Sequence, residues 1–550
     1  MSEHARGDTP IVVSQPVEGA TPRSVWALCV LAAVVFVTAA IRLRLLDVPL
    51  DRDEGEYAYF GQLLLEGVPP YAAAYNLKAP GIYAAYALIL AAFGQTTTGI
   101  HLGLILVTSA TTVLTFLLAR HLAGPAAGLV AAAVFAVQAL NPKVLGFAAY
   151  AEHFVLLPVV AGSLVLRAQA RERRPLLVLA GGLLFGLAFL MKQSAAAFIA
   201  GGALYLLLSS ADDGSARWRR RLRTTALFLA GAVTPFALVC LALLLAGTLG
   251  TFWFWAFVYG STYSAELSKG WTNLVGILEY VAPSSSVTLA LGAIGLGALL
   301  RDRLRSRRLF VLFLAAASCL GTTVGLHFRP QYCLLLLPAL AVLAAIGLDA
   351  LGRILAAPRP SMLRRAVPMV LVATALGQPL YASRDVLFEL GPAQVSRAIY
   401  GRNPFPEAVE IARYIREHTA PGDRVAVVGS EPQIYFYAGR RSATGYIYTY
   451  PLMELQPYAA AMQQQMIREI ETADPRYLVF VRATGSWLVR EASDQTIFGW
   501  FAQYQRSFTR VGVVDIVSRR ETTYRWGAEA LDYAPRSDVW LMVFERGRKP

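Results

Sequence analysis

Long apolar stretches without an ionisable side chain dominate residues 25 to 381, as in LVLAGGLLFGLAFL (177–190) and LFVLFLAAASCL (309–320). Charged residues make up 16% of the chain and hydrophobic residues 56%, whereas a typical soluble protein carries about 25% charged residues. This composition excludes a soluble globule and predicts a polytopic α-helical membrane protein. The cysteines all lie within apolar segments, which argues against a disulfide framework or a CxxC metal site.

A membrane-spanning helix needs roughly 20 apolar residues. We expect about 11 spans, and the first is too long and too poor in small residues to be a cleaved signal peptide. The segment Ala79–Phe93 is left out, because it is short and suits a re-entrant or interfacial helix. The predicted cores are Val25–Leu46, Ile100–Leu118, Ala123–Leu140, Ala148–Leu166, Leu176–Met191, Ser194–Leu208, Thr225–Leu245, Ser284–Leu300, Leu309–Val324, Tyr332–Leu351 and Ala366–Tyr381.

The net charge of +14 comes mostly from arginines in short loops between apolar stretches. Membrane topology explains this pattern better than nucleic-acid binding, because cytoplasmic loops collect Lys and Arg. With a cytoplasmic N-terminal tail (1–24), Arg42 and Arg44 lie at the outer end of the first span, but all four Arg-rich loops lie inside: 167–175, 212–223, 301–308 and 353–365. We therefore expect a transmembrane catalytic region over 25–382, with an outer loop at 47–99, and an extracytoplasmic domain over 383–550.

The segment after Tyr381 has shorter apolar runs and more charge. RVAVVG, YLVFV and VWLMVF predict buried strands, and PEAVEIARYIREHT and MQQQMIREIE predict helices, so this part reads as a small α/β domain. It lacks both GxGxxG and GxxxxGK[ST], which argues against a nucleotide site.

Four carboxylates crowd into the outer loop at Asp51, Asp53, Glu54 and Glu56. One interpretation is a capping box, with Asp53 as N-cap and Glu56 three residues later, but this leaves Glu54 unexplained. Lys78 follows in the same loop, where it can either snorkel to the interface or hold a phosphate as a point charge.

These residues resemble the first outer loop of the GT-C glycosyltransferases, a group that includes the protein mannosyltransferases, the aminoarabinose transferase of lipid A and the RgtA/B/C/D-like enzymes. That family's approximate pattern, DE(G/A)xYA followed by KPPL, corresponds here to Asp53–Ala58 and Lys78–Gly81. Ala79 and Gly81 depart from it. The resemblance extends along the predicted spans and more loosely to the outer domain.

Other outer-face residues fit the same resemblance. It implies that Glu152 lines an acceptor site, although a helix-start Glu also suits the helix dipole. Lys192 lies in an outer turn, where snorkelling is the alternative. His327 and Arg329 form a basic outer turn that either anchors the topology or faces an anionic ligand. The aromatic segment FWFWAFVYGSTYS (252–264) either covers the site or anchors in the headgroup belt.

The resemblance implies inverting transfer of a sugar from a polyprenyl-monophosphate carrier to a lipid, glycan or protein acceptor. Asp53 would be the general base, Glu54 would tune it or bind the acceptor, and Lys78, Lys192 and Arg329 would stabilise the phosphate. This scheme requires no metal or other cofactor, although a divalent cation remains compatible with it. The alternatives are a transporter or flippase of a lipid-linked or anionic substrate, disfavoured by the lack of half-repeats, and a binding module on a membrane scaffold.

Overall fold

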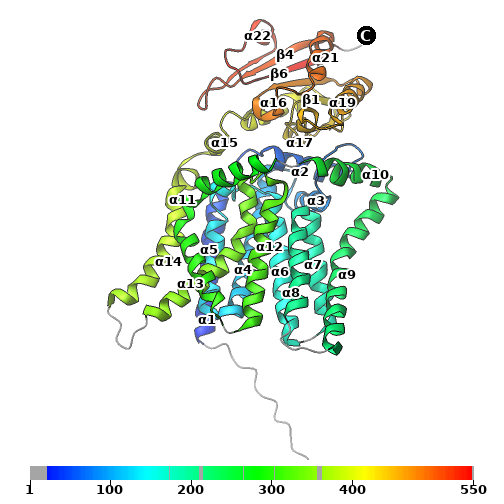
Figure 1. Ribbon diagram of the computed structural model, residues 1–550. Helices are drawn as coiled ribbons and strands as arrows, with labels where there is room; N and C mark the ends of the chain where they lie inside the picture. Colours follow the sequence, from blue (N-terminus) through cyan, green and yellow to red (C-terminus); the bar gives the residue numbers. More distant parts are fainter. Residues whose placement is uncertain are drawn as a thin grey trace, which may run out of the picture.

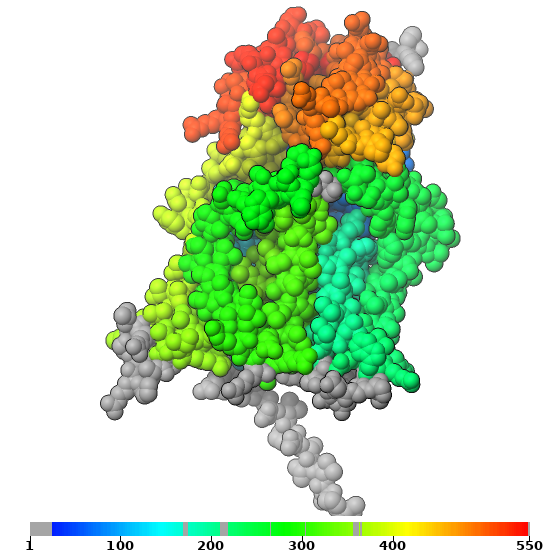
Figure 2. All heavy atoms as spheres, viewed as in Figure 1, coloured from blue at the N-terminus to red at the C-terminus, as the bar shows by residue number. Residues whose placement is uncertain are grey.

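The computed structural model describes residues 22–172, 174–209, 215–263, 266–302, 304–355 and 362–547. A helical bundle forms one part of the molecule, and a sheet domain formed by the C-terminal part of the chain covers one end of it (Figures 1 and 2). Residues 1–21 of the predicted tail, and parts of the four Arg-rich loops, lie outside the described residues.

The bundle confirms the polytopic helical class. Seven helical segments are long and apolar enough to cross a membrane: Val25–Leu43, Thr97–Ala123, Ala151–Ala168, Trp218–Leu245, Leu267–Leu300, Arg305–Leu326 and Pro330–Leu355. They belong to α1 (Pro22–Leu43), α4 (Thr97–Ala123), α6 (Ala151–Glu172), α9 (Ser215–Leu245), α11 (Leu267–Leu300), α12 (Arg305–Thr323) and α13 (Leu337–Leu355).

Helices with shorter apolar stretches occupy the four remaining predicted cores: α5 (Pro125–Gln138), α7 (Pro175–Met191), α8 (Ala196–Leu208) and α14 (Met362–Ala382), whose apolar part is Ala366–Ala382. The segment left out of the count forms α3 (Gly81–Phe93), a helix of 13 residues that packs beside α2 (Arg52–Leu65). The total of 11 spans remains a prediction.

Large apolar side chains lie on the outside of the bundle. Phe36 in α1 is 73% exposed, and Leu106 in α4 and Leu238 in α9 are each 61% exposed. Water would make such a surface costly, whereas lipid tails solvate it well. These exposed faces therefore agree with a membrane-embedded bundle.

Neighbouring helices approach closely at glycines, which have no side chain. A Cβ atom at Gly182 of α7 would collide with the backbone of Phe228 in α9, and one at Gly295 of α11 would collide with the backbone of Leu343 in α13. Small residues at helix interfaces allow this packing in membranes, where dispersion contacts replace the hydrophobic effect.

The two outer arginines of the first span have structural partners. Arg42 donates to the carbonyl of Ala139 at the end of α5, at 2.7 Å, and Arg44 donates to the carbonyl of Phe388, also at 2.7 Å. Both guanidinium groups therefore donate hydrogen bonds to backbone carbonyls of neighbouring segments.

The C-terminal domain contains a six-stranded sheet in the order β2-β1-β3-β6-β4-β5. Its strands are β1 (Arg424–Val428), β2 (Arg441–Ser442), β3 (Tyr477–Arg482), β4 (Phe508–Asp515), β5 (Thr523–Trp526) and β6 (Trp540–Arg546). β1 pairs in parallel with β2 and β3, and the other pairs are antiparallel. The three predicted strands are confirmed as β1, β3 and β6, whereas β4, β5 and the two-residue β2 were not predicted.

The two helices predicted in this domain are also confirmed, as α16 (Phe405–Glu417) and α19 (Ala459–Ala473). The shorter helices are α15 (Pro392–Tyr400), α17 (Gln433–Ala438), α18 (Tyr450–Met453), α20 (Thr484–Trp487), α21 (Thr496–Tyr504) and α22 (Ala528–Asp532). In the outer aromatic segment, α10 (Leu249–Trp253) leads into a π-helical turn, Phe254–Tyr259.

Helix α2 lies between the bundle and the C-terminal domain (Figure 1). Its N-cap is Asp51, whose side chain accepts from the backbone N–H of Glu54 at 2.9 Å, while the Glu54 carboxylate accepts from the backbone N–H of Asp51. The predicted capping box was therefore wrong by two residues. The helix begins at Arg52, so Asp53 and Glu56 lie within it and their side chains are available for other contacts.

Candidate active site

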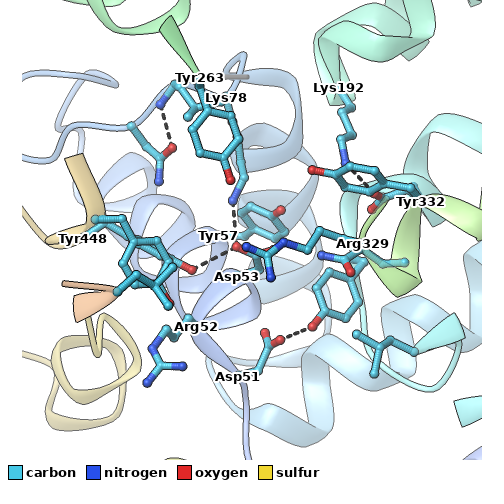
Figure 3. A pocket seen from close by; sticks show the side chains of 18 of the residues that line it. Asp51, Arg52, Asp53, Tyr57, Lys78, Lys192, Tyr263, Arg329, Tyr332 and Tyr448 are labelled. Atoms are coloured by element: carbon cyan, nitrogen blue, oxygen red, sulfur yellow. Dashed lines mark hydrogen bonds and ion pairs between the residues drawn. The ribbon is translucent and has the colours of Figure 1, made fainter. Parts of the chain in front are cut away.

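A cavity of about 410 Å³ lies where the bundle meets the C-terminal domain. The bundle side contributes five of the seven predicted site residues, namely Asp53, Lys78, Glu152, Lys192 and Arg329. The C-terminal domain closes the other side with Tyr448, Tyr450, Gly485 and Leu488. Figure 3 shows the charged and tyrosine side chains converging on this space from both parts.

Each of the four crowded carboxylates has hydrogen-bond donors of its own, and Asp53 and Glu56 also share Lys78. Asp51 accepts from the hydroxyl of Tyr150, and burial together with the charges of Glu54 and Asp53 raises its pKa to about 8. Glu56 accepts from Tyr83 at 2.7 Å and from Lys78 at 2.8 Å. Within the described ranges, no three His, Cys, Asp or Glu side chains gather in a way that could hold a metal ion.

Asp53 is the carboxylate of this cluster that faces the cavity with a free oxygen. Lys78 Nζ and Tyr448 Oη both donate to Asp53 Oδ1, each at 2.9 Å. Burial alone would raise the pKa of Asp53, but the charge and hydrogen bond of Lys78 and the hydroxyl of Tyr448 lower it below its usual value. Among the described residues, none donates a hydrogen bond to Oδ2, so this oxygen can accept a proton from a bound molecule.

Lys78 is fixed between two carboxylates. Its ammonium also lies 4.6 Å from the ring centre of Tyr57, and Tyr71 holds the Lys78 carbonyl by a hydrogen bond of 2.5 Å. Burial opposes the charged form, but Asp53 and Glu56 outweigh it and raise the pKa of Lys78 above its usual range. An ammonium has three N–H donors, so one remains for a ligand after the two carboxylates are satisfied.

Lys192 and Glu152 form a second charged pair on the same cavity wall. The carboxylate of Glu152, in the first turn of α6, accepts from the Lys192 ammonium, which also lies 3.8 Å from the ring centre of Tyr332. The next residue, Gln193, donates to the Leu77 carbonyl at 2.6 Å. This bond ties the outer turn after α7 to the loop that holds Lys78.

Arg329 differs from the two lysines because it forms no ion pair with a carboxylate in the described part of the chain. Arg329 is exposed at the cavity; its partial desolvation disfavours the charge, but surrounding tyrosines and Asp53 raise the pKa of Arg329 above its usual value. The guanidinium is therefore a charged donor at the cavity that is available to an anion.

Two predicted site residues lie outside the cavity lining. Glu54 is 2% exposed, and its carboxylate accepts from the backbone N–H of Ala149 at 2.7 Å and contacts His101 Nε2 at 3.1 Å. His327 packs against the ring of Tyr263, with 4.5 Å between the ring centres, and its burial lowers its pKa. Glu54 thus joins α2 to α4 and α6, and His327 supports Tyr263 from behind.

Part of the aromatic segment lies at the cavity, as one of its two predicted uses requires. Trp255, Tyr259 and Tyr263 line the cavity, and Trp255 stacks on Tyr75 with 5.7 Å between ring centres. Trp253 is 50% exposed. One side of this segment covers the cavity, and anchoring of its exposed side in the headgroup belt stays a prediction.

Sequence reasoning assigned no role to His101, and it did not single out Tyr150, Tyr332 or Tyr448. His101 lies opposite Glu54 and Tyr448 opposite Asp53, 47 and 395 positions apart in the chain. The carboxylate cluster signalled that partners were needed, but no spacing rule connects residues so far apart.

Comparisons with known proteins agree with this architecture. A family model described as dolichyl-phosphate-mannose-protein mannosyltransferase matches residues 77–245. The solved structure of ArnT from Cupriavidus metallidurans has a TM-score of 0.57 at 14% identity, and the alignment covers 96% of this chain and 100% of ArnT. This chain therefore resembles ArnT in fold along almost its whole length, and it matches the mannosyltransferase family model over part of its length.

The fold is also similar to that of the oligosaccharyltransferase AglB from Archaeoglobus fulgidus. The AglB structure with an inhibitory peptide and a dolichol-phosphate has a TM-score of 0.51 at 13% identity, covering 94% of this chain and 76% of AglB. A second AglB structure, tethered to an acceptor peptide, has a TM-score of 0.53 at 13% identity, covering 94% and 75%. No curated protein matches the sequence. The predicted GT-C resemblance is confirmed.

Proposed function

We propose that this protein is an inverting glycosyltransferase that moves a sugar from a polyprenyl-monophosphate carrier to an acceptor on the outer face of the cytoplasmic membrane. The observation that carries the proposal is the geometry around Asp53. A carboxylate with one free oxygen lies beside Lys78 in a cavity that also receives Lys192 and Arg329. The proposed transfer needs a base that takes the acceptor's proton and cations that stabilise the carrier phosphate.

The cations provide the site for the carrier phosphate. Lys78 retains one N–H donor, and Arg329 is free of carboxylate partners in the described part of the chain, so both can contact phosphate oxygens. Lys192 lies on the same wall, beside Tyr332. The dolichol-phosphate held in the AglB structure is a carrier of the same chemical class.

In the reaction, the acceptor hydroxyl gives its proton to Asp53 Oδ2 as its oxygen attacks the anomeric carbon. The bond between that carbon and the phosphate oxygen breaks, and its electron pair leaves with polyprenyl monophosphate, whose added negative charge the cations stabilise. Asp53 later releases the proton to water. A general base typically contributes about 10² to 10⁴ in rate, and preorganised charges usually contribute at least as much.

The other predicted residues act around this centre in the proposed scheme. Glu152, held by Lys192, lines the wall on which the acceptor would lie. Glu54 and His327 act through their neighbours, because Glu54 anchors the start of α2 and His327 supports Tyr263.

We also propose that the C-terminal domain (383–550) is extracytoplasmic, that the transmembrane catalytic region spans 25–382 with its outer loop at 47–99, and that the tail 1–24 is cytoplasmic. The exposed arginines at the start of α9, Arg219 and Arg220, support this orientation. In Figure 1 this end of α9 lies far from the C-terminal domain. Arginine-rich helix ends favour the cytoplasmic side.

The proposal is tested first in a strain that lacks the protein. Mass spectrometry of its carrier lipids and envelope glycans should show a sugar-loaded polyprenyl monophosphate accumulating and one glycan, lipid or protein losing that sugar. The accumulated donor then serves as substrate for the purified protein. Movement of the donor across vesicles without its consumption would instead indicate a flippase and would overturn the proposal.

The second test is Asp53→Asn. Asparagine keeps an oxygen that accepts from Lys78 and Tyr448, and the N-cap at Asp51 is untouched, so the fold should persist. Because the amide cannot accept the acceptor's proton, we expect turnover to fall by about 10² to 10⁴. Asp53→Ser should be equally inactive. Near-normal transfer by purified Asp53→Asn protein would eliminate Asp53 as the base.

A further inference from the structure

The catalytic cavity is incomplete without the C-terminal domain, which contributes a direct contact to the carboxylate of the proposed base. Tyr448 belongs to that domain, and its ring is 9% exposed. Its hydroxyl donates to Asp53 Oδ1 at 2.9 Å, and its ring centre lies 5.8 Å from the Lys78 ammonium (Figure 3). Tyr448 therefore contacts both members of the Asp53–Lys78 pair.

The segment that carries Tyr448 is fixed within its own domain. The next residue, Thr449, is fully buried; its backbone N–H donates to Ser430 Oγ at 2.9 Å, and its hydroxyl donates to the Ser486 carbonyl at 3.0 Å. Tyr450 donates to the Gly485 carbonyl at 2.6 Å. The position of the Tyr448 hydroxyl is thus set by the domain as a whole.

The domain is in turn locked to the helix that carries Asp53. Arg52, the residue before Asp53, pairs with the fully buried Glu431 at 2.5 Å and donates to the Ser430 carbonyl at 2.8 Å. The contacts close a ring: Asp53 to Tyr448, Tyr448 through Thr449 to Ser430, and Ser430 to Arg52. Any displacement of the domain relative to α2 would break both the ion pair and the Tyr448 bond.

We infer that Tyr448 is a positioning residue supplied by the C-terminal domain, which occupies Asp53 Oδ1 together with Lys78 and leaves Oδ2 as the oxygen that takes the proton. The inference rests on the proposed role of Asp53. Without the tyrosine hydroxyl, the carboxylate could rotate about its side-chain torsions and offer either oxygen to Lys78. The oxygen that takes the acceptor's proton would then have no fixed position.

The hydroxyl has a measurable electrostatic effect because it stabilises the ionised carboxylate. Tyr448→Phe should therefore raise the pKa of Asp53. A hydrogen bond to a charged group is strong enough to move the pKa by about 1 pH unit. The other charged or titratable groups that act on Asp53 remain in place in this variant. They are Asp51, Glu56 and Tyr57 on α2, the cations Lys78, Lys192 and Arg329, and the tyrosines Tyr86, Tyr150, Tyr263, Tyr332, Tyr400 and Tyr450.

The test uses the full-length purified protein and the carrier-linked sugar that accumulates in the deletion strain. We expect Tyr448→Phe to shift the acid limb of the kcat/KM profile upward by about 1 pH unit. Infrared titration of the carboxyl band that disappears in Asp53→Asn should show the same shift. Tyr446→Phe is the matched control, because Tyr446 lies two positions away and donates to Gln465, without contacting Asp53.

A purely structural tyrosine would lower the rate equally at every pH, with a fall in melting temperature and no shift in either titration, and that result would overturn the inference. Failure of the proposed function looks different. If Asp53→Asn remained active, the base assignment itself would be wrong, whatever Tyr448→Phe did. If Asp53→Asn were inactive and Tyr448→Phe left the Asp53 titration unchanged, only the role of Tyr448 would be rejected.

Discussion

At Gly55, helix α2 lies very close to the backbone of the C-terminal domain. A Cβ atom at this position would lie 2.6 Å from Gln433 Cβ, 2.7 Å from its backbone N and 2.8 Å from its Cα, at the start of α17. Backbone atoms cannot rotate away as a long side chain can. Since non-bonded carbons prefer separations of about 3.5 to 4.0 Å, Gly55→Ala should push the domain away from α2 by roughly 1 Å.

That displacement bears directly on the cavity although Gly55 does not line it. The bond between Tyr448 Oη and Asp53 Oδ1, now 2.9 Å, would lengthen towards roughly 4 Å, where it no longer counts as a hydrogen bond. A misplacement of about 1 Å in a catalytic constellation can cost on the order of 10²-fold in rate. We therefore expect Gly55→Ala to lose about 10 to 10²-fold in turnover.

Gly276→Ala in α11 is the matched control, because this helical glycine has nothing within 4 Å of the added Cβ. Both substitutions should gain the same helix propensity, about 1 kcal/mol. Turnover and thermal unfolding of both purified variants separate the two effects. If Gly55→Ala kept the wild-type turnover, pH profile and melting temperature, the idea that tight docking of the domain positions the base would be refuted.

Four other outcomes follow from the site and its orientation. Arg329→Met should weaken donor binding by roughly tenfold or more with little change in melting temperature, because no carboxylate of the described residues loses a partner. Lys78→Met should weaken binding and also lower the melting temperature, since Asp53 and Glu56 are left without their cation; unchanged donor affinity in titrations with both variants would remove the phosphate assignment. Asp51→Asn should become more stable relative to wild type as pH rises from about 4 to 8. The pKa of Asp51 is raised to about 8 in the folded protein, so the folded wild type holds a proton that the unfolded chain releases at lower pH. The wild type therefore loses stability over this pH range, and the variant, which lacks this carboxyl group, does not. Thermal unfolding at pH 5 and pH 8 checks this prediction, and a constant difference would contradict it. Reporter fusions at Trp218 should report the cytoplasm, and an outer-face signal there would overturn the proposed orientation.

The sequence was sufficient for features that depend on local composition and periodicity. Apolar runs without charges predict membrane helices because lipid tolerates neither unpaired backbone groups nor unpaired charges. Short apolar runs such as RVAVVG predict strands buried inside a domain. β1, β3 and β6 are found where these runs occur. β4 and β5 were missed because their exposed or half-buried positions interrupt the apolar pattern.

The outer loop shows where local reasoning failed. The spacing of Asp53 and Glu56 fits a capping box as well as that of Asp51 and Glu54 does, and the helix start at Arg52 decides between them. That start is fixed by contacts remote in sequence, since Glu54 binds the N–H of Ala149 and Arg52 binds Glu431. Tertiary contacts therefore determined which acid caps the helix and which faces the cavity.

The sequence by itself determined the chemical inventory of the site: a carboxylate cluster, a lysine in the same loop, and basic residues in two later outer turns. The tertiary structure decided the geometry, because a hydrogen bond depends on distance in space and not on separation along the chain. Asp53 and Tyr448 are 395 positions apart, yet their side chains are joined by a bond of 2.9 Å. This contact forms because the C-terminal domain docks on α2, and it leaves a single oxygen of Asp53 directed into the cavity.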